Sequence, residues 1–557
     1  MGLERFVLLT GLFVLLPIAA DGQVIPSSEL PGRERERFVE PVPPKSKPAG
    51  PTLTLPSTVA PEAAGSVTLR IVKFQIDGST VYGAEQLRSL HAEFVGQQVP
   101  LSVVYEVAQR ITATYGAAGY VLSRAIVPPQ ELDPAAAVVR IEVVEGYVDR
   151  VEWPDSLDGY RNFFSDYSAR ITAERPTNIK TVMRYLLLAG DLPGITVGSR
   201  FQASENNERA STLIVEIEEK PFDAFARVDN LGTEPRGPWE FAATASANNW
   251  FRHHEALTAT FAGAFETSEL QYVGLDYSQV LNSEGLTLFG DASYSWGEPG
   301  TVPLQLLEYQ SLGLFVEGGL SYPVIRSRDK NLSVSGLFFL NNSDGEMLSS
   351  PNTKDRLRGI RLAVDFDAAD RRGGISQINA VLSQGINGLG SMTKGDPTAS
   401  ATAGRVDFTK IDATIGTVQP VVGNVSARLA AEGQYAFESL PAAEECGFGG
   451  RVFGRGLDPS EITGDRCWAV VGEVRYDLTI PNIPSAAVQF YAFADYGDVY
   501  RIKPSEGTSK TEDGSSAGLG LRLGWNERIN ADLFAAKPLL GRDDDDWRYF
   551  LLATARY

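Results

Sequence analysis

The sequence has few of the residues from which catalytic and metal sites are usually built. Its 557 residues include only two cysteines and three histidines: Cys446, Cys467, His91, His253 and His254. No cysteine or acidic cluster joins the adjacent histidines at the spacing of a metal site. The string at 514–518 (GSSAG) fits the G-x-S-x-G pattern, but it opens a predicted strand, whereas a nucleophile elbow joins a strand to a helix. We therefore expect no enzyme, no metal and no cofactor.

Long apolar runs and an excess of positive charge are missing as well. After residue 20 no run approaches the roughly 20 apolar residues of a membrane-spanning helix, so a membrane protein of this composition has to be a closed β-barrel. The chain carries 50 Lys and Arg against 70 Asp and Glu, a net charge of −20. A nucleic-acid partner requires a basic surface and is therefore not expected. The acidic run at 543–546 is interpreted as a solvated loop.

Residues 1–22 are predicted to be a secretory signal peptide. The basic Arg5 precedes an apolar core at 6–19, and the small residues at 20–22 (ADG) offer a cleavage site. An uncleaved anchor is the alternative, but this core is short for a spanning helix. The chain is therefore expected to enter an oxidising compartment, where disulfides form.

Two compact units are expected between a linker and the C-terminal half. Residues 23–66 are rich in proline and charge and are predicted to be an extended linker, with a possible short helix at 29–38 (ELPGRERERF). Units of α+β type are predicted at 67–147 and 148–221, each in the order strand, helix, helix, strand, strand. In the first unit one helical face is formed by Val104, Val107, Ala108, Ile111 and Tyr115.

From residue 222 to 557 the chain divides into sixteen segments that alternate apolar and polar residues. In the last segment, one face carries Trp547, Tyr549, Leu551, Ala553, Ala555 and Tyr557. One face of such a strand meets lipid and the other a wet lumen. Long and short connections also alternate, the longest lying near 298–309, 388–407 and 438–465. The pattern predicts a mainly β chain with a 16-stranded antiparallel transmembrane β-barrel, preceded by the two α+β units.

The two cysteines bracket the longest of these connections. Cys446 and Cys467 lie at the ends of the strands that flank it. We predict a disulfide across the base of the loop, with two separate thiols as the alternative. Equal mass in non-reduced, alkylated samples before and after reduction would exclude the bridge.

The loop at 438–465 contains a glycine-rich string, GGRVFGRGL, that ends at Leu457. Its glycines let the backbone fold back sharply and pack against a wall. Arg455 lies between Gly454 and Gly456, so its guanidinium is free to reach outward. We expect this loop to enter the barrel as an internal lid.

A strand that follows the loop supplies the partner expected for this arginine. Alternation along the strand places Phe493, Asp495 and Gly497 in the lumen. We predict that Arg455 and Asp495 form an ion pair that pins the lid. The alternative is that the charges are unrelated, one solvated and one lining the lumen.

Several strings resemble those of two-partner-secretion transporters. The strings at 119–130 (GYVLSRAIVPPQ) and 144–148 (VEGYV) resemble the first polypeptide-transport-associated (POTRA) domain of that family, and 175–194 (RPTNIKTVMRYLLLAGDLPG) resembles the second. This resemblance assigns the two α+β units as POTRA 1 and POTRA 2.

The lid and strand motifs resemble the same family, which has a (V/I)-R-G-(Y/F) loop tip and an F-x-D-x-G strand. Arg455 and Gly456 match the loop motif, and Asp495 lies at the centre of the strand motif. Gly454 and Leu457 stand where the family more often has valine and an aromatic residue. Both departures concern the flanking packing, so we expect the arginine contact to be kept.

The resemblance implies a bacterial outer-membrane transporter with its POTRA domains in the periplasm. Such a protein recognises an unfolded partner through the POTRA domains and exports it through the barrel to the cell surface. The implied client is one large secreted protein, typically a β-helical adhesin or haemolysin. Outer-membrane lipid is the other partner, with no nucleic acid and no nucleotide. The alternative is an assembly factor that inserts other barrels, but such factors usually carry more POTRA units. A passive porin should lack both POTRA domains and lid motifs.

We predict that the client pairs with a strand edge, or with the helix–strand groove beside it, in the first unit. The candidate edge comprises Ser123, Arg124, Ala125, Ile126 and Val127. Pro128 and Pro129 would stop self-pairing beyond it. Because the periplasm lacks ATP, folding of the client outside the cell must supply the pull.

Overall fold

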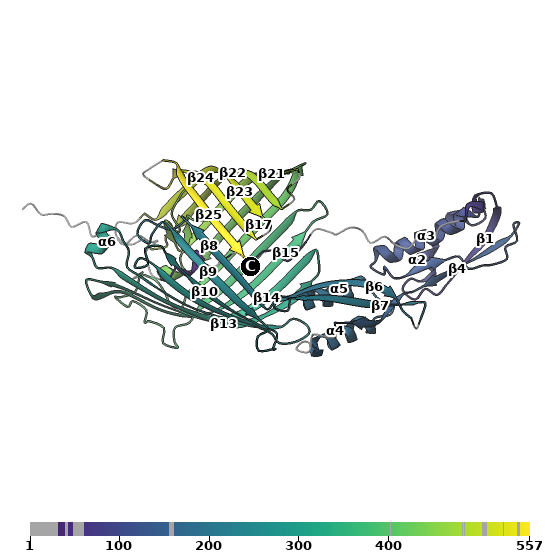
Figure 1. Ribbon diagram of the computed structural model, residues 1–557, viewed down its shortest axis with the longest axis horizontal. Coiled ribbons are helices and arrows are strands. Elements are labelled where there is room, and N and C mark those ends of the chain that lie inside the picture. The colour runs from purple at the N-terminus through teal and green to yellow at the C-terminus, as the bar shows by residue number, and fades with distance from the viewer. Residues whose placement is uncertain are drawn as a thin grey trace, which may run out of the picture.

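The structure is a computed structural model of the chain. It describes residues 32–38, 40, 43–47, 61–154, 161–205, 207–401, 403–481, 483, 485–503, 509–526, 528–542 and 546–557. The predicted signal peptide lies outside these residues, and so does most of the predicted linker. The described chain forms a barrel, an arm of two α+β units and a short N-terminal segment inside the barrel (Figure 1).

Sixteen strands close the barrel, each antiparallel to its neighbours, and β25 pairs with β8 to complete the ring. The predicted fold class is therefore confirmed. The strands are β8 Phe222–Asp229, β9 Glu240–Asn248, β10 Glu255–Ala264, β11 Gln271–Val280, β12 Thr287–Gly297, β13 Gln310–Arg326, β14 Lys330–Met347, β15 Ser350–Ala369, β16 Ile375–Gly385, β17 Thr409–Val422, β18 Val425–Ala436, β21 Arg466–Leu478, β22 Ala486–Tyr500, β23 Thr511–Trp525, β24 Ile529–Leu540 and β25 Arg548–Arg556.

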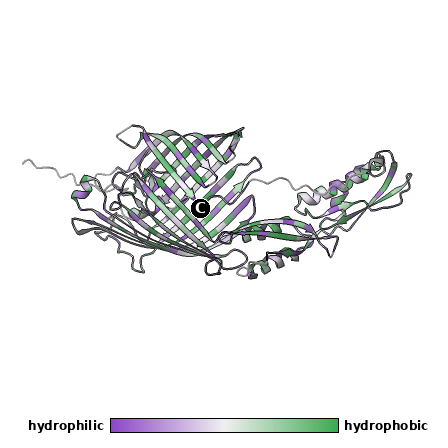
Figure 2. Ribbon diagram, viewed as in Figure 1, coloured by the Kyte–Doolittle hydropathy of each residue, from purple (hydrophilic) through white to green (hydrophobic). Residues whose placement is uncertain are grey.

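The barrel wall has an apolar outside and a mixed, largely polar inside. On β22, Phe490 is 48% exposed on the outside, whereas its neighbour Tyr491 is 5% exposed in the lumen. Successive side chains of a strand point to opposite faces, so this alternation runs the length of each strand. Figure 2 shows hydrophobic and hydrophilic residues interleaved along the barrel strands. The periodicity read from the sequence thus decides which side chains reach the lumen.

One outer hairpin is longer than the sequence pattern predicts. Polar residues at 344–355 suggest a loop there, but β14 and β15 continue through this stretch and have 18 and 20 residues. They meet in a turn at Leu348 and Ser349, whose φ angles are +49° and +58°. Cross-strand hydrogen bonding thus prevails over local polarity, because polar side chains are also compatible with a strand that faces water on both sides.

The first α+β unit packs its helices on one face of a four-stranded sheet. The sheet has the order β2-β1-β4-β3, with β1 parallel to β4. Its elements are β1 Thr68–Asp77, α2 Ala84–Arg88, a 3₁₀ turn at Ala92–Phe94, β2 Gln98–Pro100, α3 Ser102–Ala117, β3 Arg124–Ile126 and β4 Ala137–Val144. The short strand β2 is an addition to the predicted order. The apolar face of α3 is buried against the sheet.

The second unit has the same plan with three strands, in the order β5-β7-β6. Its elements are β5 Tyr147–Glu152, α4 Arg161–Ala173, α5 Ile179–Gly190, β6 Ile195–Ala203 and β7 Ala210–Glu219. This unit lies beside the barrel rim, and the first unit lies at the far end of the arm (Figure 1). Among the helices that the structure describes, none is long and apolar enough to cross a membrane.

Candidate functional site

The connection between β18 and β21 folds back into the barrel lumen. It contains a 3₁₀ turn at Ala442–Glu444 and a two-stranded sheet of β19 Cys446–Phe448 and β20 Ile462–Gly464. The ring of Phe448 is 2% exposed and lies against Gly497 of β22 and Gly514 of β23. A Cβ atom at either glycine would overlap this ring. Gly497, from the predicted strand motif, is therefore needed so that the lid can lie flat on the wall.

The side chain of Asp495 holds the lid by accepting a hydrogen bond from the backbone of the lid. Its Oδ2 accepts a hydrogen bond from the Arg455 backbone N–H at 3.2 Å, and its Oδ1 accepts two from Ser516, at 2.7 Å from Oγ and 3.0 Å from the amide. Ser516 Oγ in turn accepts from the Gly456 amide at 3.0 Å. The structure therefore brings Arg455 and Asp495 together, but the predicted ion pair between their side chains is wrong, because the guanidinium extends to a different carboxylate.

That carboxylate is Glu473 on β21, whose side chain is fully buried. Arg455 Nη2 lies 2.8 Å from Glu473 Oε2. Arg475 and Arg522 reach Glu473 Oε1 at 2.5 Å and 2.8 Å. One buried carboxylate thus binds three guanidinium groups, and ion pairs are strongest where water is excluded. Because Glu473 anchors all three, its loss would leave like charges close together.

Glu473 lies outside both motifs, but it pairs across the strands with a residue of the F-x-D-x-G motif. On β21, Glu473 is the cross-strand partner of Phe493 in the F-x-D-x-G strand. Phe493 itself lies under the lid arginine, with its ring centre 4.3 Å from the Arg455 guanidinium carbon. Alternation along β21 places Glu473 among the inward-facing carboxylates, but the register that sets it beside Phe493 comes from the structure.

The remaining lid residues lie at close backbone contacts. Gly454 has a φ of +68°, and a Cβ atom there would lie 2.8 Å from the Gly449 amide nitrogen. A Cβ atom on Gly456 would lie 2.8 Å from Ser516 Cβ. Leu457, 2% exposed, packs into the lid core. Glycine at 454 thus permits a left-handed turn where the family more often has valine.

Cys446 and Cys467 are joined in a disulfide. The bond ties the first residue of β19 to the start of β21, so it closes the base of the lid loop. It limits how far the lid can separate from the strand that carries Glu473.

A short helix of the N-terminal segment, α1 Arg35–Phe38, lies inside the barrel. Arg35 pairs with Glu317 at 3.1 Å and with Asp291 at 3.3 Å, which belong to β13 and β12. Arg37 pairs with Glu240 of β9 at 3.3 Å. The helix falls within the predicted 29–38 stretch, but it is only four residues long and is held by the wall instead of lying in a free linker.

The same segment touches the lid. Glu40 accepts from Arg227 of β8 at 2.6 Å and from Arg451 of the lid at 3.2 Å. At the other end, Arg33 donates to Ser460 Oγ of the lid at 3.2 Å. We call residues 32–38, 40 and 43–47 the inner segment. Lid and inner segment are thus bound to each other as well as to the wall.

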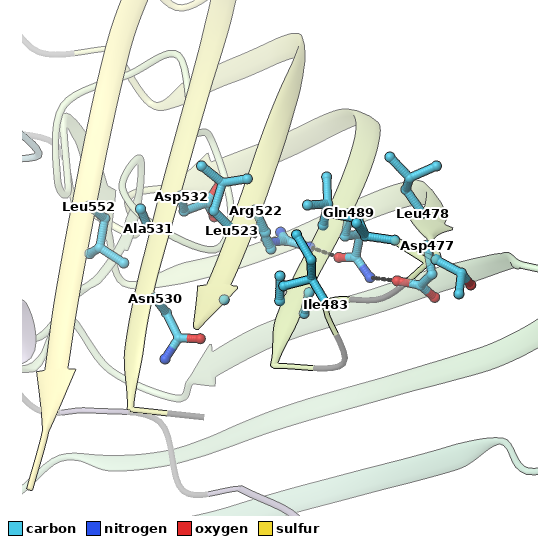
Figure 3. A pocket seen from close by; sticks show the side chains of 16 residues that line it. Asp477, Leu478, Ile483, Gln489, Arg522, Leu523, Asn530, Ala531, Asp532 and Leu552 are labelled. Atoms are coloured by element: carbon cyan, nitrogen blue, oxygen red, sulfur yellow. Dashed lines mark hydrogen bonds and ion pairs between the residues drawn. The ribbon is translucent and has the colours of Figure 1, made fainter. Parts of the chain in front are cut away.

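A cavity of about 760 Å³ opens at the end of the barrel where β21 turns into β22. Figure 3 shows Asp477, Gln489 and Arg522 side by side along its wall, joined by hydrogen bonds of 2.7 Å and 2.8 Å. Because Arg522 also binds Glu473, a continuous polar path leads from this mouth to the anchor of the lid. The inner segment lies at a different part of the same rim, where the Ser46 amide donates to Asp367 at 2.5 Å.

Two family models match this chain. The model described as "POTRA domain, ShlB-type" matches residues 69–146, and that described as "Haemolysin secretion/activation protein ShlB/FhaC/HecB" matches residues 356–523. The heme/hemopexin transporter protein HuxB of Haemophilus influenzae (strain 86-028NP) is 22% identical over 85% of this chain and 84% of its own length. The chain is a homologue of the two-partner-secretion transporters.

A second relative and a solved structure agree with this homology. The outer membrane transporter CdiB of Dickeya dadantii is 21% identical over 82% of this chain and 81% of its own length. The solved structure of CdiB from Escherichia coli has a TM-score of 0.68 over 91% of this chain and 94% of that chain, at 18% identity, and so shares the fold. The predicted resemblance to two-partner-secretion transporters is confirmed, and so is the predicted localisation, an outer membrane with the POTRA units in the periplasm. These relatives are named as transporters.

POTRA 2 is docked on the periplasmic rim of the barrel. Arg326, at the end of β13, donates to both carboxylate oxygens of Asp191, at 2.7 Å and 2.9 Å. Glu284, in the β11–β12 turn, accepts from Tyr185 at 3.0 Å and from Arg184 at 3.3 Å. The rings of Phe163 and His254 lie 4.1 Å apart at the same contact, where burial holds the pKa of His254 below its usual value.

We expect Arg326→Glu to loosen this docking, since it opposes the Asp191 carboxylate and removes a bidentate contact worth about 2 kcal/mol. Hydrogen–deuterium exchange of α5 in the full-length protein should rise. The swap Asp191→Arg with Arg326→Glu should restore protection. Arg328→Glu is a matched control, because Arg328 is exposed on the same turn. Equal exchange in the two single variants would contradict the assignment.

The structure restricts the predicted client edge. Ser123 is 1% exposed and accepts a hydrogen bond from the Gly146 amide. Ala125 is fully buried, and its amide donates to Thr112 Oγ1 of α3 at 2.9 Å. These two residues are therefore not available to a client, because α3 packs against the short strand β3. Arg124, Ile126 and Val127 are less buried and stay the predicted contacts on this edge.

Proposed function

We propose that this chain exports one large partner protein, captured unfolded in the periplasm by the POTRA arm and passed through the barrel to the cell surface. The observation that carries the proposal is a lumen that holds two ionically bound elements, the lid and the inner segment, above a POTRA arm docked on the periplasmic rim. A static pore needs neither element. A pore that opens for one large substrate needs the lid and the inner segment to be held by ion pairs and hydrogen bonds that the substrate can replace.

Client capture is proposed to use strand edges of the arm. The edge at β3 offers three residues, Arg124, Ile126 and Val127. A longer one lies in POTRA 2, where β6 has nine residues and pairs only with β7 in the part of the chain that the structure describes. An unpaired edge presents backbone N–H and C=O groups to an extended chain, which binds regardless of its side-chain sequence. Two edges on one arm favour an unfolded client over a folded one.

Gating is proposed to begin at the periplasmic mouth. The cavity beside Gln489 is large enough for an extended segment, and Arg522 joins it to the anchor at Glu473. A client segment that competes for these hydrogen bonds weakens the hold on the lid. The lid and the inner segment, being bound to each other through Glu40 and Arg451, then move together. Folding of the client outside supplies the pull, because no nucleotide is present in the periplasm.

The test is the secreted proteome of the source cell with and without this gene. We expect one large, repeat-rich protein to disappear from the medium or surface, because the transporter serves a dedicated client, while other outer-membrane barrels keep their levels. Complementation with the wild-type gene is the control. A fall in many barrels would instead establish the alternative, an assembly factor, and would overturn the export role. A neighbouring gene for a very large repeat-rich secreted protein would further support export.

A further inference from the structure

The strings that resemble the POTRA motifs of the family converge at one place in the structure. The last residue of β4 is Val144 and the first of β5 is Tyr147, so only Glu145 and Gly146 separate the two POTRA units. The end of α3 and the start of α5 meet at this same junction. Part of these strings therefore lies between the units, namely Gly119, Ser123 and Gly146 with Thr177 and Asn178, whereas Arg124, Ile126 and Val127 lie on the β3 edge.

Gly119 and Asn178 form the first contact of the junction. Gly119 follows α3 with a φ of +99°, and a Cβ atom there would overlap the Asn178 side chain. Asn178 Nδ2 donates to the Ala118 carbonyl at 3.0 Å, while Asn178 Oδ1 caps α5 by accepting from the Lys180 amide at 3.0 Å. The Ile179 amide donates to the Gly119 carbonyl at 2.8 Å. One helix cap of POTRA 2 is thus bonded to a helix end of POTRA 1.

Gly146 forms the second contact. Its amide donates to Ser123 Oγ at 3.1 Å, and its carbonyl accepts from the Thr177 amide at 3.2 Å. A Cβ atom on Gly146 would overlap the Leu122 carbonyl, a backbone group that cannot turn aside. The Leu122 side chain packs into the hydrophobic core of POTRA 2. Ser123 and Thr177 are each 1% exposed, so water does not compete for these bonds.

Glu145 fixes the adjoining loop of POTRA 1. Its carboxylate accepts from the Thr80 amide at 2.7 Å, the Val81 amide at 3.0 Å and the Tyr115 hydroxyl at 2.7 Å. Burial acts to raise the pKa of Glu145, but these hydrogen bonds outweigh it and hold the pKa below its usual value. The charged form is therefore kept at neutral pH, and the residue next to Gly146 has little freedom.

We propose that Gly119, Ser123, Gly146, Thr177 and Asn178 are positioning residues that lock POTRA 1 and POTRA 2 into one rigid arm. This inference rests on the export function proposed above and assigns a part within it. Because POTRA 2 is docked on the barrel through Arg326 and Asp191, a locked joint also fixes POTRA 1 relative to the periplasmic mouth. The strand edges of β3 and β6 are then presented to one client chain at a constant separation.

A fixed separation has a measurable consequence for a client that binds both edges. When one ligand engages two sites, the second event gains an effective concentration that depends on the geometry between the sites and is lost when that geometry fails. A loose joint therefore reduces capture without changing either edge. The residues of the joint touch no client, so they act on export only through the angle between the units.

The test uses Gly119→Ala in the full-length protein, with Gly96→Ala as matched control. Gly96 lies in the same POTRA unit with a φ of +85° and has open space where a Cβ would be, so it carries the same backbone strain without the clash. The double variant Gly119→Ala with Asn178→Gly removes the clashing side chain, and glycine at a helix N-cap costs only a few tenths of a kcal/mol. Spin labels at Ala113→Cys and Ser199→Cys, both exposed, report the distance between the units.

We expect Gly119→Ala to shift or broaden the distance distribution and to lower export of the client by about tenfold or more. Gly96→Ala should change neither. The double variant should restore both only in part, because it removes the clash and keeps the backbone bonds of the joint but loses the Asn178 bond to Ala118. An unchanged distribution in Gly119→Ala would overturn the joint. A changed distribution with wild-type export would overturn its positioning role. The distance measurement needs no client, so failure of the joint is separable from failure of the export function, which the secreted proteome reports.

Discussion

Replacing Arg455 and Glu473 together by alanine is expected to cost hardly more than replacing either alone. Breaking a buried ion pair by removing one partner costs about 3–5 kcal/mol, because the other charge is left without compensation. Arg455 Nη2 and Glu473 Oε2 are 2.8 Å apart, with side chains 6% and 0% exposed. Each single variant should therefore release the lid. The open probability of the channel in planar bilayers measures this directly, and client export should fall in parallel.

A double-mutant cycle on Arg455 and Asp495 should give a different result from the one on Arg455 and Glu473. Asp495 accepts from the Arg455 backbone amide, which an alanine at 455 retains. Arg455→Ala and Asp495→Ala should therefore be close to additive in free energy, whereas Arg455→Ala and Glu473→Ala should be strongly coupled. Asp365→Asn, on a distant strand of the barrel, serves as the control. Strong coupling to Asp495 with none to Glu473 would mean that the lid is held by the ion pair that the motifs predict.

Deleting residues 23–60 is expected to raise the conductance of the channel severalfold. The deletion removes the inner segment, which contacts the lid through Arg33 and the periplasmic rim through Ser46. Arg35, Arg37 and Glu40 tie it to the wall. Removing it leaves the lid without Arg33 and Glu40, so the lid itself should open more often. Unchanged conductance would show that the inner segment does not obstruct the pore.

A charge swap separates obstruction by the inner segment from general damage to the chain. Arg37→Glu and Glu240→Arg each place two like charges at this contact, so each should raise the open probability of the channel. The expected rise is about tenfold for every 1.4 kcal/mol lost from the free energy that binds the inner segment to the wall. The combined swap recreates the pair with its charges exchanged and should close the channel again. An open channel in the combined variant would indicate that Arg37 and Glu240 act independently.

Much of the architecture follows from the local pattern of the chain. Alternation of apolar and polar residues over 222–557 is enough to predict a sixteen-stranded barrel, because the two faces of a membrane strand meet lipid and lumen. The same alternation places Asp495 and Gly497 inside. The helices of both POTRA units follow from their 3.6-residue periodicity. The pattern was misleading at 344–355, where polar residues on both faces of the β14–β15 hairpin remove the apolar alternation although the strands continue.

Partner choice inside the barrel was not accessible from the pattern. The motifs placed Arg455 near Asp495, but the guanidinium of Arg455 binds Glu473. From the sequence alone, any inward-facing carboxylate on the neighbouring strands could have been its partner. The inner segment looked like a linker because its alternating Arg and Glu residues suit solvent as well as a charged lumen. Ser123 was predicted to contact the client because the sequence does not show that it is buried and bonded to the Gly146 amide. Both features depend on the tertiary structure.

The difference between what the sequence determines and what only the tertiary structure decides has a physical reason. Strand and helix periodicity, turn glycines and the spacing of motifs depend on residues close in sequence. The sequence by itself therefore determines the barrel, the POTRA units, the lid loop and the resemblance to two-partner-secretion transporters. Ion pairs and hydrogen bonds depend on which side chains meet across hundreds of residues, and carboxylates and guanidinium groups are interchangeable until distances are known. Only the tertiary structure decided that Glu473 anchors the lid, that the inner segment lies in the lumen, and that the POTRA motif residues form a joint.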